Sequence, residues 1–70
     1  MSWMRSVYSS MASEIGYDDE TEEVLVRWAK SGKLSAYKAP EDVALAAANA
    51  GSVGDYINFE LKPNYAHRYR

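Results

Sequence analysis

The segment VLVRWAKSGK, residues 24–33, carries the clearest structural signal in this chain. Its β-branched and aromatic residues occupy every second position as far as Trp28, which predicts a strand over about residues 24–29. The following Lys30-Ser31-Gly32-Lys33 predicts a hairpin turn, because glycine readily adopts the positive φ that such turns need. A second strand is therefore expected at about residues 33–38, antiparallel to the first.

A third strand is expected on the N-terminal side of this pair. The run Asp18-Asp19-Glu20-Thr21 is typical of a turn, because short acidic side chains bond to their own backbone. Ahead of it, Ile15-Gly16-Tyr17 predicts a strand over about residues 13–17. Short links join the three strands, so they should form an antiparallel meander, since parallel strands would need a long crossover. Residues 1–10 show no clear period and predict no regular element.

Two helices are expected from Pro40 onward. Proline suits the first position of a helix, and the acidic and alanine-rich residues that follow predict a helix over about residues 40–50. Ser52 suits an N-cap, with Asp55 as its capping-box partner, and predicts a second helix over about residues 52–62. The apolar stripe that this helix should turn toward the sheet consists of Val53, Ile57 and Leu61. The predicted fold class is α+β, a three-stranded antiparallel meander packed by two C-terminal helices (βββαα).

Length and composition indicate a single domain, residues 1–70, with a thin core. The chain has no cysteine, which excludes disulfides and thiolate metal sites. Six tyrosines against one phenylalanine suit a thin core and also suit an interface. No apolar run approaches the roughly 18 residues of a membrane span and no signal peptide is evident, so we expect a cytoplasmic protein. The basic tail, residues 63–70, is expected to be ordered at Tyr65 and frayed beyond it.

No catalytic, metal or cofactor site is predicted. The single histidine, His67, lies in the tail, where no neighbour in the sequence would orient it, and is expected to be exposed and without function. Ser31-Gly32-Lys33 lacks the upstream glycine and the following helix of a phosphate-binding loop. The acidic residues within 14–23 lack the ligand spacing of a calcium loop. We therefore expect a protein that acts by binding and is not an enzyme.

The segment from Ser52 to Asn58 is the first candidate for a binding site. Gly54 inside a helix costs up to about 1 kcal/mol relative to alanine, which indicates either close backbone packing or room for a ligand. The Asn58 amide donates and accepts hydrogen bonds, so it suits a ligand contact or the cap of a neighbouring turn. The tail adds bases between aromatic residues, a mixture that fits nucleic acid and equally fits a solubilising tail. The candidate binding residues are Ser52, Gly54, Tyr56, Asn58, Lys62, Tyr65 and Arg68.

Several of these segments form one combined pattern. Its parts are Ser9-Ser10, Ile15-Gly16-Tyr17-Asp18, Val24-Leu25-Val26-Arg27-Trp28 and Ser52-x-Gly54-x-Tyr56-Ile57-Asn58, followed by Leu61-Lys62 and Tyr65. The pattern resembles the KTSC domain, a small bacterial and phage family named for its occurrence at the C-terminus of some lysyl-tRNA synthetases. The resemblance spans nearly the whole chain and implies a short antiparallel sheet packed by helices, without a settled biochemical role. Ser35 stands where the family usually has tyrosine, and Lys62 stands where arginine is usual, which loses the planar fork that grips an anion at two points.

Two functions from different classes are open. The favoured one is a protein-interaction module of a phage, prophage or bacterium, with a second copy or a host factor as partner. The thin core, the net charge of −2 and the open sheet edge favour it. The alternative is an RNA- or nucleotide-binding accessory domain that uses Lys62, Arg68 and Arg70 with Tyr65, Tyr69 and Asn58. A third, weaker interpretation is a small-ligand pocket near Gly54 and Asn58.

Overall fold

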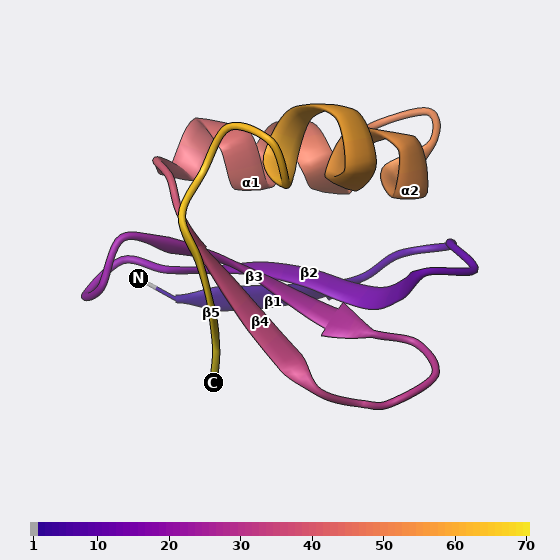
Figure 1. The fold of residues 1–70 in the computed structure, drawn as a ribbon, viewed down its shortest axis with the longest axis horizontal. Coiled ribbons are helices and arrows are strands. Elements are labelled where there is room, and N and C mark those ends of the chain that lie inside the picture. The colour runs from indigo at the N-terminus through magenta and orange to yellow at the C-terminus, as the bar shows by residue number, and fades with distance from the viewer. Residues whose placement is uncertain (1) are drawn as a thin grey trace.

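In the computed structural model, which describes residues 2–70, an antiparallel sheet carries helices on one of its faces (Figure 1). The strands are β1 (Trp3–Ser6), β2 (Ala12–Asp18), β3 (Glu23–Trp28), β4 (Leu34–Lys38) and β5 (His67–Tyr69). The helical segments are α1 (Glu41–Ala48), α2 (Val53–Tyr56) and η1 (Ile57–Leu61), a π-helical turn that continues α2. The α+β class, the antiparallel sheet and the two helices agree with the sequence-based prediction.

The number of strands does not agree, because the sheet has five strands in the order β1-β2-β3-β4-β5. The prediction of a three-stranded sheet is therefore wrong. The three expected strands coincide with β2, β3 and β4, and the two that were missed are the edge strands. β1 pairs with β2 from Trp3 opposite Tyr17 onward. β5 pairs with β4, with Tyr69 opposite Ser35. The tail was expected to fray beyond Tyr65, but it forms this strand instead.

Neither edge strand has the alternation of buried and exposed side chains by which a strand is usually predicted from sequence. Every residue of β5 is exposed, and in β1 Trp3 alone is partly buried. A strand without alternating buried side chains has no hydrophobic period to detect. β5 also pairs with a strand that precedes both helices in the chain, a long-range contact that no local signal reports.

β1 approaches β2 very closely at Gly16, which lies opposite Met4. A methyl group added to Gly16 would overlap the Met4 sulfur and the carbonyl oxygen of Trp3. Glycine is required at this position for lack of space. At Gly32, in the hairpin between β3 and β4, it is required for another reason, a φ of 72°.

The core fills the layer between the sheet and the helices. Its largest fully buried apolar side chains are Ile15, Val24 and Val26 from the sheet and Ile57 and Leu61 from η1. Ala44 and Ala47 of α1 are also fully buried, and their small size lets the helix lie close to the strands. The stripe predicted from Val53, Ile57 and Leu61 therefore faces the core.

Local hydrogen bonds define the second helical segment. Ser52 Oγ accepts a hydrogen bond from the backbone N–H of Asp55 at 3.3 Å, as the predicted N-cap requires. Beyond Tyr56 the helix widens, because the N–H of Lys62 donates to the carbonyl of Ile57 at 2.8 Å, five residues back. Across residues 2–70, no helix combines the length and apolar character needed to cross a membrane.

Candidate functional site

The segment from Ser52 to Asn58 packs against the loop between β1 and β2. A methyl group added to Gly54 would lie 3.2 Å from Met11 Sδ and 3.5 Å from Ser9 Oγ. Asn58 Nδ2 donates a hydrogen bond to the same sulfur at 3.4 Å. Of the two interpretations of this segment, the contacts support close packing, with Gly54 and Asn58 holding the loop against the helix.

Ser52, Tyr56 and Tyr65 also contribute to the fold. Ser52 caps α2. The two tyrosines are half-buried and pack against the core. Burial raises the pKa of the Tyr56 phenol, and the neighbouring Tyr65 and Glu60 raise it further. Each of the three side chains thus has a role in the fold.

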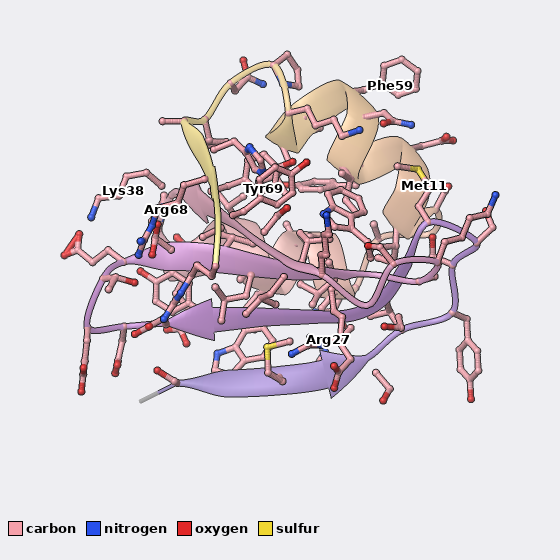
Figure 2. All side chains as sticks on the ribbon, turned by 60° about the horizontal axis from the view of Figure 1, so that its bottom comes forward. Met11, Arg27, Lys38, Phe59, Arg68 and Tyr69 are labelled. Carbon is pink, nitrogen blue, oxygen red and sulfur yellow. The ribbon has the colours of Figure 1, made fainter. Side chains whose placement is uncertain are left out.

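Arg68 lies on the sheet face that the helices leave open. Side chains alternate along β5, so Arg68, which sits opposite Ala36, points away from the side taken by His67 and Tyr69 (Figure 2). Its guanidinium donates two hydrogen bonds to the Glu23 carboxylate, at 2.7 and 2.8 Å. Glu23 is only 6% exposed, so the pair supplies the partner that a buried carboxylate needs. Arg68 therefore fastens β5 to the sheet.

This ion pair predicts a loss of stability in acid. The hydrogen bonds from Arg68 lower the pKa of Glu23 from its ordinary value of 4.5 to about 2, although burial opposes the change. The unfolded chain then binds the proton more tightly than the folded chain, so the contribution of Glu23 is complete above about pH 4.5 and is lost as the pH falls toward 2. Thermal unfolding followed by circular dichroism at a series of pH values should show this fall.

The matched control is Glu23→Gln, which should reduce the pH dependence between 4.5 and 2. Part of the pH dependence should remain because of Asp18, since a hydrogen bond from Arg70 also lowers the pKa of the Asp18 carboxyl. An equally steep acid dependence in Glu23→Gln and in the parent chain would contradict the assignment.

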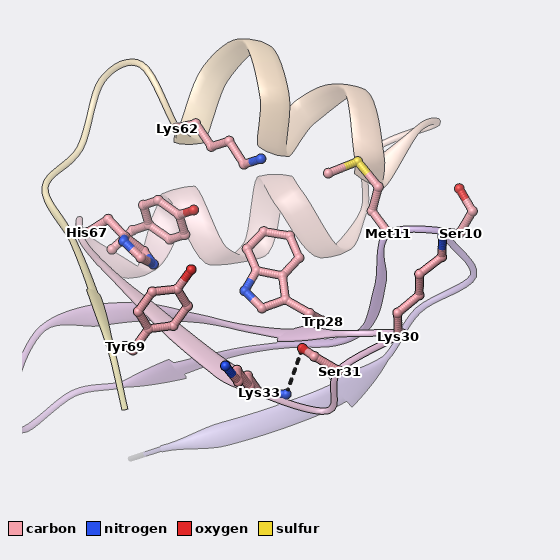
Figure 3. A pocket seen from close by; sticks show the side chains of 10 residues that line it. Ser10, Met11, Trp28, Lys30, Ser31, Lys33, Lys62, His67 and Tyr69 are labelled. Carbon is pink, nitrogen blue, oxygen red and sulfur yellow. Dashed lines mark hydrogen bonds between the residues drawn. The ribbon is translucent and has the colours of Figure 1, made fainter.

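Among the candidate binding residues, Lys62 lines a groove on the surface. The groove has a volume of about 890 Å³ and lies between η1, β5 and the β3–β4 hairpin (Figure 3). Its aromatic residues are Trp28, Tyr37, His67 and Tyr69. Its lysines are Lys30, Lys33 and Lys62, and we refer to it as the lysine groove. Ser10, Met11 and Ser31 complete the lining.

The rings in the lysine groove are held in defined positions. The indole N–H of Trp28 donates to Ser35 Oγ at 2.6 Å, and His67 Nε2 lies 2.9 Å from the same oxygen. The His67 ring also contacts Tyr37, with 4.9 Å between ring centroids, and meets Tyr69 nearly edge-on at 4.7 Å. The expectation that nothing orients His67 is therefore wrong, because β4 and β5 together fix its ring.

The Ser35–His67 contact has the distance of a nucleophile and its general base, yet its surroundings do not suit catalysis. Ser35 is fully buried, so a substrate cannot reach its hydroxyl. The same oxygen accepts the hydrogen bond from the Trp28 indole and lies within hydrogen-bond distance of His67 Nε2, so it contacts both rings. Ser35 therefore orients the two rings. Within residues 2–70, no group of three or more His, Cys, Asp or Glu side chains could hold a metal ion.

The charge around the lysine groove is positive although the chain as a whole is negative. Lys30 and Lys33 come from the β3–β4 hairpin, and Lys62 comes from the opposite wall, its Nζ 5.3 Å from the ring centroid of Trp28. The lining contains no aspartate or glutamate. Three carboxylates pair with arginines outside the groove: Glu14 with Arg27, Glu23 with Arg68 and Arg70, and Asp18 with Arg70.

Sequence reasoning missed most of the groove because its walls meet only when β5 joins the sheet. The signal that could have found it is the alternation of His67 and Tyr69 around Arg68, a period of two within the tail. Trp28 lies in the clearest predicted strand but was assigned no functional role.

Comparison with known proteins identifies a family and a solved structure that this chain resembles. The model of the KTSC domain family matches residues 8–65. A crystal structure of a KTSC domain protein from Yersinia pestis superposes with a TM-score of 0.85 and 22% sequence identity, covering 100% of this chain and 99% of that one. No curated protein matches the sequence significantly. The resemblance noted from the sequence motifs is thereby confirmed, while β5, with His67 and Tyr69, lies outside the range that the family model matches.

Proposed function

The chain belongs to the KTSC domain family, and we propose that it is a non-catalytic binding module whose lysine groove takes an anionic ligand. The observation that carries the proposal is the meeting of Lys30, Lys33 and Lys62 around one hollow that no carboxylate lines. Concave surfaces lined by charge of one sign raise the local concentration of oppositely charged ligands.

The charges of these lysines are available to a ligand. Within residues 2–70, no ion pair joins Lys30, Lys33 or Lys62 to a carboxylate. A bound anion would therefore not have to compete with an internal salt bridge. The arginines of the open sheet face differ, because their charges are already neutralised by Glu14, Asp18 and Glu23.

The groove changes the balance between the two functions expected from the sequence. It supports the RNA- or nucleotide-binding alternative, but through Lys30, Lys33 and Lys62 in place of Arg68 and Arg70. The protein-interaction hypothesis is supported by two exposed aromatic residues, Tyr8 at 104% and Phe59 at 71%. Scattered surface aromatics are normal in monomeric proteins, so they carry less weight than the groove.

Neutralising the groove lysines should weaken the binding of anions. Lys33→Gln and Lys62→Gln are each expected to lower the affinity for fluorescently labelled inorganic polyphosphate about fivefold, since a lysine near an anionic surface contributes roughly 1 kcal/mol. Binding should also weaken as salt rises, because each lysine contact releases counterions. Fluorescence anisotropy titrations at several salt concentrations measure both effects.

Lys38→Gln is the matched control, since it removes the same charge outside the groove. Lys38 Nζ donates to the carbonyl of Thr21 at 2.6 Å, by the turn between β2 and β3 (Figure 2). The affinity of the Lys38→Gln variant for polyphosphate should stay within about twofold of that of the parent protein. Equal losses in Lys38→Gln and Lys62→Gln, or no binding of polyphosphate or of any labelled oligonucleotide at low salt, would refute the proposed function.

A further inference from the structure

We infer that the ligand of the lysine groove carries unpaired nucleobases, so that the groove binds single-stranded nucleic acid. The inference rests on the proposed function and adds to it the role of the aromatic wall. An anion of any kind would be attracted by Lys30, Lys33 and Lys62, but the rings between them favour a ligand with flat faces of its own.

Tyr69 is an exposed residue of this wall. Its side chain is 68% exposed, although it belongs to a strand and lines the groove. Its backbone lies opposite Ser35, and on its other side the ring meets His67 edge-on. The adjacent Arg68 holds the strand in place through its hydrogen bonds to Glu23. The ring is thus presented to solvent in a fixed position, which reduces the entropy lost when a base stacks on it.

Trp28 supplies a second ring inside the groove, oriented by its hydrogen bond to Ser35. Lys62 Nζ lies 5.3 Å from the centroid of this ring, so a positive charge stands next to the aromatic wall. A single strand offers the complementary arrangement, because each of its bases is linked to a phosphate. Figure 3 shows Trp28 between Lys62 above and Lys33 below, with Tyr69 to its left and Lys30 at the right, beside Ser10.

The chemistry of the cations and the size of the groove support the same class of ligand. Lysine is a common point-charge partner of phosphate, and the groove is lined by three lysines. Its volume of about 890 Å³ lies within the roughly 300–1,000 Å³ of ligand pockets. A duplex turns the faces of its bases inward, so its rings could not stack on Tyr69 or Trp28.

The experiment compares ligands that share charge but differ in bases. Full-length protein is titrated by fluorescence anisotropy with labelled oligouridylate, oligothymidylate, an abasic oligonucleotide of the same length, a duplex, polyphosphate and polyglutamate. Either base-containing single strand should bind at least tenfold more tightly than the abasic strand, since stacking contributes roughly 1–3 kcal/mol per base. Binding of the RNA strand, the DNA strand or both supports the inference and identifies the source.

Variants test the ring itself. Tyr69→Ala should weaken binding of the single strands about tenfold and leave polyphosphate binding unchanged, while Tyr69→Phe keeps the ring and should keep the affinity. Tyr8→Ala, which removes an exposed tyrosine outside the groove, is the control. Unchanged melting temperatures establish that the variants are folded.

The outcomes separate this inference from the proposed function. If the abasic strand and polyphosphate bind as tightly as oligouridylate, and Tyr69→Ala changes nothing, the nucleobase inference is overturned while anion binding stands. Tighter binding of polyglutamate than of every nucleic acid also overturns it and identifies an acidic peptide as the ligand. Absence of binding to all six probes overturns both.

Discussion

Gly16→Ala is expected to lower the free energy of unfolding by about 3 kcal/mol, because β1 cannot stay in place beside an added methyl group. The Met4 side chain opposite could rotate away, but the carbonyl oxygen of Trp3 belongs to the backbone and cannot. The whole edge strand would have to shift, with loss of its pairing to β2. Since a chain of this size has only a few kcal/mol of stability, a large fraction of the variant should be unfolded at 37 °C.

Gly51→Ala is the matched control for this change. A methyl group on Gly51 would meet nothing within 4 Å, so the control should stay within about 0.5 kcal/mol of the parent. Urea denaturation followed by tryptophan fluorescence measures both variants. Similar midpoints for Gly16→Ala and Gly51→Ala would show that β1 does not pack on β2 as described.

Removal of the last strand, by ending the chain at Ala66, should have an effect of similar size. The truncation takes away Arg68 and leaves the buried Glu23 carboxylate without its main partner, a situation that typically costs about 3–5 kcal/mol. It also uncovers Tyr37, which is 3% exposed beneath His67. Thermal unfolding of the truncated and full-length chains checks this expectation.

Substitution of Glu23 tests whether its unpaired charge causes the loss of stability in the truncated chain. In the full-length chain, Glu23→Gln should destabilise by about 1–2 kcal/mol, because it weakens hydrogen bonds to a charged group. In the truncated chain the same substitution should be neutral or stabilising, because a neutral amide is easier to bury than an unpaired carboxylate. If Glu23→Gln destabilises both chains equally, β5 is not held through this ion pair.

The parts of the fold that the sequence predicts correctly are those with local causes. The alternation up to Trp28, the turn at Gly32 and the cap at Ser52 each depend on neighbours within a few residues. The edge strands have no such cause. β1 depends on the space left by Gly16, and β5 depends on a partner for Glu23, and both are contacts between distant parts of the chain.

The candidate site was harder to predict for the same reason. Gly54 and Asn58 were named as candidates because a glycine inside a helix lowers stability. In the structure both residues pack against Met11. Lys62 was identified, but its neighbours in the groove come from the hairpin and from β5, which join it only through sheet pairing. Arg68 was named as a binding residue from the basic tail, and its pairing with Glu23 could not be foreseen, because that contact follows from the register of an unpredicted strand.

The two ends of the sheet have opposite charge, which makes the molecule an electric dipole. Glu20 and Glu22 lie at the turn between β2 and β3, and Glu41 at the start of α1 lies close by, bonded to Trp3 next to that turn. Lys30 and Lys33 lie at the far end, in the β3–β4 hairpin (Figure 1). In dilute buffer this field would rotate the protein before contact, so that a polyanion meets the lysine end first. At about 0.1 M salt the field is screened beyond roughly 10 Å, and collisions become random in orientation.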